Sequence, residues 1–276
     1  MRIVRDVASV RAAVAGGGRV GLVPTMGALH AGHLSLIRAA RAACDLVVVW
    51  LFVNPTQFNE ASDLATYPRD EQRDAALAER AGADILFAPP VEEVYPAGFA
   101  TTVTVAGLGD ILEGAQRPGH FAGVATVVAK MLNMVGPDVA FFGAKDAQQV
   151  AVVKRLVADL DIPTRIAVQP IVREPDGLAM SSRNVRLGDD DRRRATALHR
   201  GLLAARAAAS AGERDAVSLA RIVEGVLAGE SIDAEYVAVV DPGTFDSLTT
   251  LDRPGLIALA ARVGPVRLID NMEVAP

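Results

Sequence analysis

The chain has 276 residues, a formal net charge of −5 and 51% hydrophobic residues. This length suits one large or two ordinary domains with a proper core, and the composition shows no sign of disorder. The acidic balance argues against a nucleic-acid surface, while a single cysteine excludes an internal disulfide framework and favours a reducing, cytoplasmic setting. We expect no secretory signal at the amino terminus, and the longest apolar run, residues 46–53, is too short to span a bilayer as a helix.

Strand and helix signals alternate along the first 172 residues. The predicted strands are residues 20–23, 46–53, 84–88, 103–105, 139–142 and 165–172. The predicted helices are residues 34–43, 64–81 with Gly82 as its C-cap, 108–113, 121–135 and 148–160. This alternation indicates βαβ units around a parallel sheet, in which ligands bind beyond the carboxyl ends of the strands.

The pattern changes after residue 172. A loop over residues 173–184 precedes Ala-rich helical segments at 190–211 and 216–228, and three predicted strands follow at 234–240, 256–261 and 266–269. We therefore expect an α/β protein with a Rossmann-like parallel-sheet domain over residues 1–172, which binds nucleotide and substrate. A smaller α+β lid domain would follow over residues 173–276, with the loop as a hinge that could grip a ligand.

Two histidines follow the first strong strand. We expect Pro24 to end that strand and Gly27 to permit a sharp bend before His30 and His33, which lie three residues apart and share one face of a helix. A helix N-terminus favours an anion, so the pair predicts phosphate chemistry. A metal site, or two histidines held by local hydrogen bonds, are the alternatives on these residues alone, although zinc needs three or four ligands.

Amide and cationic side chains follow other predicted elements. Asn54 and Gln57 could bind a hydroxyl and a carboxylate of a small substrate, although the Asn-Pro pair is also typical of a plain turn. Arg117 could hold a carboxylate or phosphate, with His120 near a second helix N-terminus; a solvated surface loop is the alternative.

A third group follows the strand at 139–142. Gly143 permits close approach of a ligand, Lys145 supplies a charge for a phosphate, and Asp146 could accept from ribose hydroxyls or simply cap the helix. The Met-Ser-Ser-Arg-Asn loop at residues 180–184 could wrap a triphosphate through Arg183, although a polar linker would have the same composition.

Together these segments resemble the pantothenate synthetase (pantoate–β-alanine ligase) family, within the His-x-Gly-His nucleotidyltransferase-like superfamily. The resemblance spans residues 20–185. It rests on the motifs Pro-Thr-Met-Gly-Ala-Leu-His-Ala-Gly-His at 24–33, Phe-Val-Asn-Pro-Thr-Gln-Phe at 52–58, Tyr-Pro-Arg at 67–69, Arg-Pro-Gly-His-Phe-Ala-Gly-Val at 117–124, Phe-Gly-Ala-Lys-Asp-Ala-Gln-Gln at 142–149 and Asp-Gly-Leu-Ala-Met-Ser-Ser-Arg-Asn at 176–184.

The resemblance implies an ATP-dependent condensation of (R)-pantoate with β-alanine through a pantoyl adenylate, which releases AMP and pyrophosphate on the route to coenzyme A. It implies catalytic roles for His33, the proton donor of the family, and for His30, Lys145 and Arg183. The ATP-binding residues that it implies are Met26, Gly27, Ala28, Leu29, His30, Ala31, Gly32, His33, Gly143, Ala144, Lys145, Asp146, Val172, Met180, Ser181, Ser182 and Arg183. The substrate-binding residues that it implies are Gln57, Gln149, Asn54, Arg117 and His120.

The same resemblance implies Mg²⁺ and a homodimer, with no nucleic-acid or membrane partner. We assign no protein ligands to the metal, for which Asp74 is only a weak candidate. Trp50 departs from the family pattern, in which a small residue is usual, and we expect it to alter packing, with a subunit contact as one option. Ala144 and Ala147 also replace larger residues. Two rival interpretations are an adenylyltransferase that leaves AMP on its product, and a nucleotide-sensing module without turnover.

Overall fold

The computed structural model describes residues 1–58 and 64–276. These residues form two compact units. The first contains Met1–Ala144 and Val152–Pro170, and the second contains Lys145–Ala151 and Ile171–Pro276. The division is discontinuous, because a short stretch after Ala144 groups with the carboxyl-terminal part of the chain. The domain boundary that the sequence analysis places after Val172 stays a prediction.

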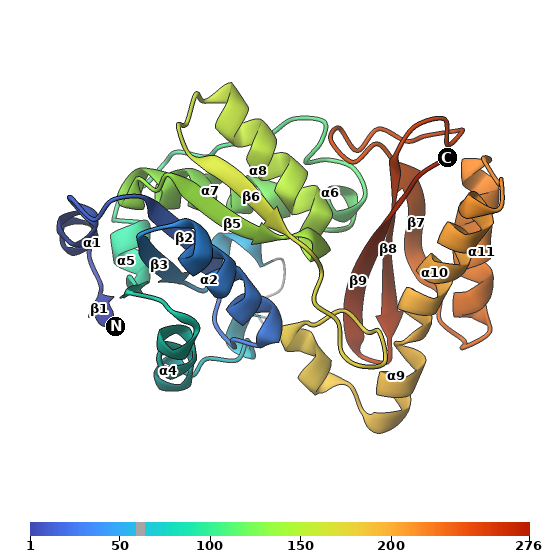
Figure 1. Ribbon diagram of the computed structural model, residues 1–276, viewed down its shortest axis with the longest axis horizontal. Coiled ribbons are helices and arrows are strands. Elements are labelled where there is room, and N and C mark those ends of the chain that lie inside the picture. Colours follow the sequence, from blue (N-terminus) through green and yellow to red (C-terminus); the bar gives the residue numbers. More distant parts are fainter. Residues whose placement is uncertain (59–63) are drawn as a thin grey trace. The chain divides into compact units, whose positions relative to one another are not determined.

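The first unit is built on a six-stranded sheet of order β1-β4-β3-β2-β5-β6, in which every pairing is parallel (Figure 1). Its strands are β1 (Arg2–Val4), β2 (Val20–Thr25), β3 (Leu46–Leu51), β4 (Ile85–Phe87), β5 (Val139–Gly143) and β6 (Arg165–Gln169). The chain moves outward through β2, β3 and β4 and then returns to place β5 beside β2. The direction of winding therefore reverses between β2 and β5, which is the point where ligands bind in sheets of this kind. This arrangement confirms the predicted Rossmann-like sheet.

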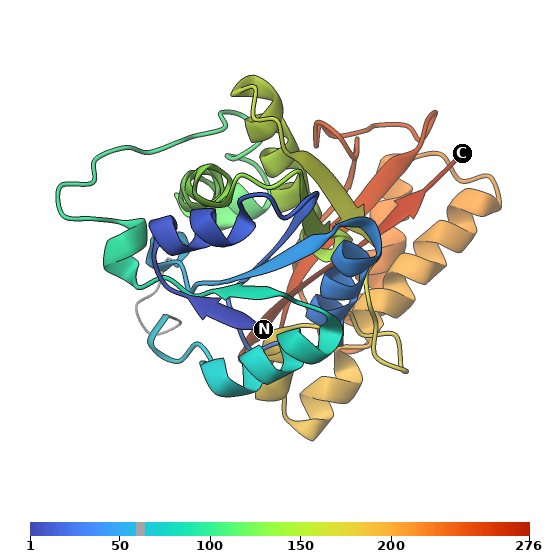
Figure 2. The same cartoon turned by 60° about the vertical axis from the view of Figure 1, so that its left-hand side comes forward.

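Helices cover both faces of this sheet (Figure 2). The helices of this part of the chain are α1 (Val7–Val14), α2 (Ala31–Ala43), α4 (Glu71–Ala81), α5 (Val91–Val94), α6 (Glu113–Gln116) and α7 (His120–Val135), with the 3₁₀ turn η1 (Pro55–Gln57). The 3₁₀ turn η2 (Ala144–Asp146) and helix α8 (Ala147–Asp159) follow β5, and their residues Lys145–Ala151 belong to the second unit. Helices α2 and α4 share a buried core with Val23, Val47, Val49 and Leu86 of the strands. Alternate strand residues point to opposite faces. Helices α1 and α7 pack together on the other face.

Trp50 lies on the face of the sheet that α1 and α7 cover. Its side chain is 3% exposed, and its ring meets Phe87 and Phe52 edge-on, with ring centroids 5.0 and 5.6 Å away. Such edge-to-face contacts add to the free energy gained by burying the rings. Trp50 therefore affects packing, as expected, but inside the unit, so the option of a subunit contact is wrong.

Pro24 does not end its strand, contrary to the prediction. Strand β2 continues to Thr25 and pairs with β3 along its whole length, Pro24 opposite Trp50. The ladder between β2 and β5, in contrast, ends at Leu22, opposite Ala140. The backbone groups of Val20 face β5, since its carbonyl accepts from Asp138 N, so by alternation those of Pro24 face the same side. The missing N–H of Pro24 thus falls where no ladder bond exists.

Three other predicted elements differ from the structure. Residues 103–105 are irregular, because the N–H of Val103 donates to Thr126 Oγ1 of α7 instead of to a strand. The predicted helix 108–113 is replaced by turns, and α6 starts only after Leu112, whose φ of 44° is left-handed. The predicted helix 64–81 is interrupted at residues 66–70, and α4 begins at Glu71, where Asp70 accepts from Arg73 N as its N-cap. The sequence analysis also missed β1 and α1.

The second unit holds a three-stranded antiparallel sheet of order β7-β8-β9. Its elements are η3 (Ser182–Arg186), α9 (Asp189–Arg194), α10 (Ala197–Ser210), α11 (Ala216–Ala228), β7 (Ala234–Val240), β8 (Gly255–Val263) and β9 (Val266–Val274). Helices α10 and α11 pack against each other and against the sheet, around a core that includes Leu202, Leu219 and Leu259 (Figure 1). The predicted α+β architecture of the carboxyl-terminal part is confirmed. Within the described ranges, no helix is both long and apolar enough to cross a membrane.

Candidate active site

The loop that leads from β2 into α2 carries the two histidines. We call residues 26–33 the histidine loop. Its backbone is left-handed at two successive positions, with φ of 90° at Gly27 and 51° at Ala28. A Cβ on Gly27 would lie 3.0 Å from Asp74 Oδ2 and 3.1 Å from Leu51 Cδ1, so both the φ value and the packing require glycine here.

The histidines hold each other's positions at the start of α2. His30 is the N-cap, just outside the helix, and its Nδ1 accepts from Gly32 N at 3.2 Å. His33 lies in the first turn, and its Nδ1 accepts from His30 N at 3.3 Å. The two rings are neighbours, with centroids 4.1 Å apart. Because each Nδ1 accepts a backbone N–H, the neutral form of each ring carries its proton on Nε2.

Asp74 of α4 holds this loop through hydrogen bonds to its backbone. Its side chain is 1% exposed, and its two oxygens accept from Ala28 N and Leu29 N, each at 2.8 Å. The sequence analysis considered Asp74 only as a weak metal candidate. The structure gives its carboxylate a different task, since both oxygens already accept backbone hydrogen bonds.

A group of amides lies at the carboxyl end of β3. Asn54 is 1% exposed and donates from Nδ2 to Gln57 Oε1 at 3.1 Å and to Gly123 O at 3.2 Å, while its Oδ1 accepts from Tyr95 Oη at 2.8 Å. Burial raises the pKa of Tyr95, and its hydrogen bond with the Thr56 hydroxyl acts the other way. Since both N–H groups of the Asn54 amide are donated within the chain, its hydrogen bonds favour a role in orienting Gln57.

Gln57 joins this group to the histidine loop and to the start of α7. Its Nε2 lies 3.0 Å from Met26 Sδ, and its carbonyl accepts from Arg117 Nη2 at 3.3 Å. The same carbonyl is 2.9 Å from His120 Nδ1, which must therefore carry a proton, and His120 Nε2 can accept from Arg117 Nη1 at 3.1 Å. The structure thus brings Met26, Asn54, Gln57, Arg117 and His120 into one hydrogen-bonded group.

Of the remaining predicted site residues, Gly143 and Ala144 belong to the first unit, and those from Lys145 onward belong to the second. Lys145 and Asp146 form a 3.6 Å ion pair in η2, and Lys145 O accepts from Asn271 Nδ2 of β9 at 2.9 Å. We call residues 171–186 the Ser-Arg segment. It starts as a hairpin, in which Met180 N donates to Val172 O at 2.9 Å, and ends in η3, where Ser181 Oγ accepts from Arg183 N at 3.2 Å.

An ion pair holds the base of the Ser-Arg segment. Arg173 donates to Asp270 of β9 through two bonds, Nη1 to Oδ2 at 2.7 Å and Nη2 to Oδ1 at 2.9 Å. The Asp270 side chain is 1% exposed and that of Arg173 19%. A bidentate, desolvated pair of this kind specifies a geometry as well as an attraction. Sequence analysis missed Asp270 and Asn271, because no local signal ties them to the motifs that they support.

Comparison with known proteins settles the family. A family model described as Pantoate-beta-alanine ligase matches residues 2–273. The chain belongs to this family. It is 54% identical to the pantothenate synthetase of Chelativorans sp. (strain BNC1), covering 99% of this chain and 98% of that protein, and 49% identical to that of Herpetosiphon aurantiacus, covering 99% of both.

Solved structures agree with this membership. The pantothenate synthetase from Thermus thermophilus superposes with a TM-score of 0.96 at 48% identity, covering 100% of both chains. The pantoate-beta-alanine ligase from Francisella tularensis, solved in complex with beta-gamma ATP and beta-alanine, gives a TM-score of 0.82 at 36% identity, with 99% and 97% of the chains covered. The protein is therefore an enzyme, a pantoate–β-alanine ligase.

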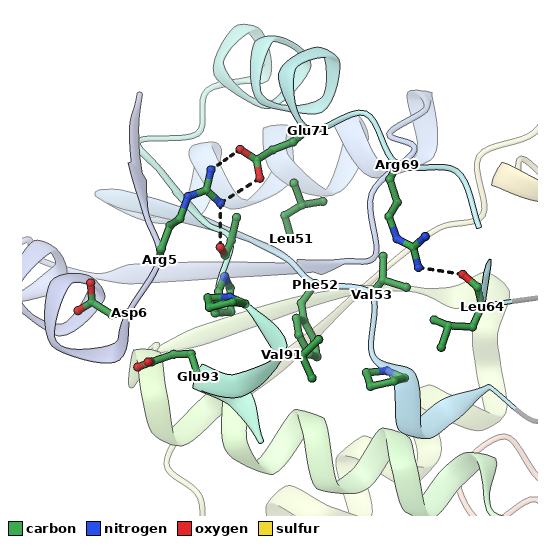
Figure 3. Close-up of a pocket in the computed structure, with 14 residues that line it drawn as sticks. Arg5, Asp6, Leu51, Phe52, Val53, Leu64, Arg69, Glu71, Val91 and Glu93 are labelled. Atoms are coloured by element: carbon green, nitrogen blue, oxygen red, sulfur yellow. Dashed lines mark hydrogen bonds and ion pairs between the residues drawn. The ribbon is translucent and has the colours of Figure 1, made fainter. Parts of the chain in front are cut away.

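An open pocket of the first unit lies apart from the predicted residues of this ligase site. Its volume is about 690 Å³, and Figure 3 shows it at the carboxyl ends of β3 and β4. Arg5 on its wall donates to Glu71 at 3.0 and 2.6 Å and to Ala88 O at 3.1 Å, and Arg69 donates to Leu64 O at 2.8 Å (Figure 3). These cations already have partners, and among the described residues none of the predicted site lines the pocket.

Proposed function

We propose that this ligase uses ATP to activate pantoate and then joins the activated acid to β-alanine. A carboxylate oxygen of pantoate attacks the α-phosphorus of ATP, the new O–P bond forms, and the bond to the β-phosphate breaks to release pyrophosphate. The amine of β-alanine then attacks the acyl carbon of the pantoyl adenylate. A C–N bond forms, the C–O bond to AMP breaks, and the amine gives up a proton. The ATP and β-alanine bound in the Francisella tularensis relative support this proposal.

The observation that carries the proposal is the geometry of the histidine pair. Both Nδ1 atoms accept backbone N–H groups, so each neutral ring presents a proton on Nε2 at the positive end of α2. Negative charge accumulates on the phosphates as the first step proceeds. Donors already held in place stabilise that charge without having to reorganise. We assign this role to His30 and His33, with His33 as the proton donor.

The other predicted residues complete the proposed nucleotide site. Lys145, Ser181, Ser182 and Arg183 hold phosphate oxygens, and Gly143 with Asp146 meets the ribose. Met26, Val172 and Met180 line the nucleotide. The main chain of residues 27–29, 31, 32 and 144 contacts the phosphates and the ribose. We propose that the Ser-Arg segment excludes water from the adenylate.

We propose that Gln57 and Gln149 bind the hydroxyl and carboxylate groups of pantoate. Arg117 and His120 lie in the hydrogen-bonded group around the Gln57 carbonyl, where they would serve the pantoate and amine pocket. Asn54 acts beside them by orienting the Gln57 amide through its 3.1 Å hydrogen bond.

We propose Mg²⁺ as the metal, held mainly by phosphate oxygens and water. Among residues 1–58 and 64–276, no three His, Cys, Asp or Glu side chains gather as a metal cage would require. Mg²⁺ does not require such a group of side chains, because it usually takes few protein ligands when phosphates are present. The ion would neutralise phosphate charge. We also propose a cytoplasmic homodimer, which light scattering on the purified chain would test.

The proposed function is tested by following pyrophosphate and AMP release from ATP, Mg²⁺ and D-pantoate, with and without β-alanine. Sustained release of both products only when both substrates are present is the expected result. Absence of any response to pantoate would overturn the proposal. Pyrophosphate release without free AMP would instead indicate transfer of AMP to an acceptor.

The role of the histidine pair is tested by the variant His33→Ala. We expect the adenylation rate constant to fall by ~10²–10³, the scale found when a single transition-state donor is removed. Normal adenylation by a folded His33→Ala protein would remove His33 from this role.

A further inference from the structure

Asp74 is a buried carboxylate that the proposed mechanism does not use. Its side chain is 1% exposed, and its strongest partners are backbone N–H groups of the histidine loop. Its ion-pair partner in the described chain is Arg73, whose Nη1 lies 3.4 Å away and which is itself 55% exposed, so the ion pair is weak. Burying a carboxylate is unfavourable unless hydrogen bonds compensate. Here the compensation comes from Ala28 and Leu29.

These hydrogen bonds hold the part of the histidine loop whose left-handed backbone conformation is unfavourable for a residue with a Cβ. Ala28 has a φ of 51°, which disfavours any residue with a Cβ, and it follows Gly27 at 90°. Strained backbone of this kind persists only where the surroundings impose it. Asp74 Oδ2 accepts from Ala28 N, and Arg73 Nη2 donates to Leu29 O at 3.2 Å, so the first turns of α4 hold the loop on both of its polar sides.

The held residues lead directly into the histidines. Leu29, whose N–H donates to Asp74 Oδ1, immediately precedes His30, and the His30 N–H is the group that orients the ring of His33. A change in the backbone at 28–29 would therefore move both rings together. Misplacing a catalytic group by about 1 Å can lower a rate ~10²-fold.

We propose that Asp74 is a positioning residue for the histidine pair, which it aims by accepting the backbone N–H groups of Ala28 and Leu29. The inference rests on the proposed role of His30 and His33 in adenylation. It assigns to the α4 carboxylate a role in the first chemical step that is exerted through the histidines.

The first test is the variant Asp74→Asn, measured by single-turnover adenylation at saturating ATP and pantoate. Asparagine has nearly the same shape, but it replaces one acceptor oxygen by an NH₂ group that faces a backbone N–H. We expect the adenylation rate constant to fall by ~10–10²-fold with the protein folded. Unchanged adenylation would overturn the inference.

A matched control separates positioning from the stability of α4. Asp70 caps the same helix by accepting from Arg73 N at 3.0 Å, and no hydrogen bond joins its side chain to the histidine loop in the described chain. We expect Asp70→Ala to lower the melting temperature while leaving the adenylation rate constant of the folded protein unchanged. An equal rate loss in Asp70→Ala and Asp74→Asn would assign the effect to α4 stability and overturn the inference.

The double variant His33→Ala, Asp74→Asn supplies a readout that a merely structural role would not move. If Asp74 acts through the histidines, its substitution should lower the rate less in the His33→Ala background than in the unaltered enzyme. Fully multiplicative losses would overturn the inference. If His33→Ala alone leaves adenylation unchanged, the proposed role of the histidine pair fails, and this outcome is distinct from a failure of Asp74→Asn alone.

Hydrogen exchange on the unaltered enzyme tests the same contact even if Asp74→Asn does not fold. We expect the amides of Ala28 and Leu29 to exchange slowly, because both donate to a carboxylate that is 1% exposed. Exchange at the rate of an open loop would show that Asp74 does not hold the segment and would overturn the inference.

Discussion

The histidine loop and the Ser-Arg segment both carry residues that we propose to bind ATP, but they are held in different ways. In the histidine loop, successive backbone N–H groups at Ala28, Leu29 and His30 donate to the side chains of Asp74 and His33. The Ser-Arg segment is held strongly at its base, where Arg173 pairs with Asp270. Farther along it, Val185 is 80% exposed, and Asn184 Oδ1 is the one buried side-chain nitrogen or oxygen in the described chain that lacks a hydrogen-bond partner.

This difference suggests a division of work. Donors that stabilise a transition state act best when they are already in place, which the dense hydrogen bonding of the histidine loop provides. A segment that is proposed to admit ATP and then exclude water needs fewer contacts, because regions that open belong to the less stable parts of a structure. The next three predictions test how far this contrast extends.

The largest effect is expected from Asp270→Ala, which removes the anchor of the Ser-Arg segment. Arg173 would remain largely buried without its partner, and breaking a buried pair in this way costs about 3–5 kcal/mol. We expect the free energy of unfolding of the second unit to fall by about that amount, measured by hydrogen exchange of β9 and α10. The exposed pair Arg193–Asp190 is the control, and Asp190→Ala should change little. If Asp270→Ala lowers the free energy of unfolding no more than Asp190→Ala does, the Arg173–Asp270 pair is not a strong anchor of the Ser-Arg segment.

A smaller loss is expected from Gly27→Ala in the histidine loop. The new Cβ would lie 3.0 Å from Asp74 Oδ2 at a φ of 90°, and such strain costs about 1–3 kcal/mol. Trp50, the single tryptophan, is buried in the first unit, so its fluorescence during urea unfolding reports the stability of this unit. Gly98 provides the control, because its φ is 81° and, apart from its chain neighbours, no described residue has an atom within 4 Å of the position that a Cβ would take there. Equal losses at Gly27 and Gly98 would show that the loop is not tightly packed.

The smallest effect is a pH dependence at the Ser-Arg segment. A Cβ on Gly177 would lie 2.2 Å from His199 Nδ1, which places this ring against the hairpin. Burial lowers the pKa of His199 below its ordinary value of 6.5, Arg173 and Arg206 lower it further, and Asp270 opposes them. As the pH falls below 6.5, the unfolded chain binds a proton before the folded chain does, so the stability of the second unit decreases.

Denaturant unfolding at about pH 7.5, 6.5 and 5.5, a range that brackets the ordinary pKa of histidine, checks this dependence. The variant His199→Gln lacks the titrating ring, so it should lose less stability than the unaltered protein as the pH falls through this range. The difference in pH dependence between the two proteins measures the contribution of His199. Identical pH dependence in both would contradict the prediction.

Local patterns in the sequence were enough for much of the fold. The alternating elements predict the parallel sheet, and Gly82 ends α4 in the left-handed conformation that its position at the C-cap predicts. Errors arose where a contact distant in the chain decided the structure. Val103 bonds to Thr126 instead of to a strand, and Pro24 stays in β2 because the neighbouring ladder ends before it.

The sequence by itself determined the family, the two-part architecture and the identity of the proposed site residues, because motifs and hydrophobic periodicity are written in neighbouring residues. Only the tertiary structure decided what holds those residues in place. Asp74 reaches a loop 46 residues earlier in the chain, and Asp270 pairs with an arginine 97 residues away. Such contacts follow from packing one element on another, and no pattern within either element specifies the partner that packing supplies.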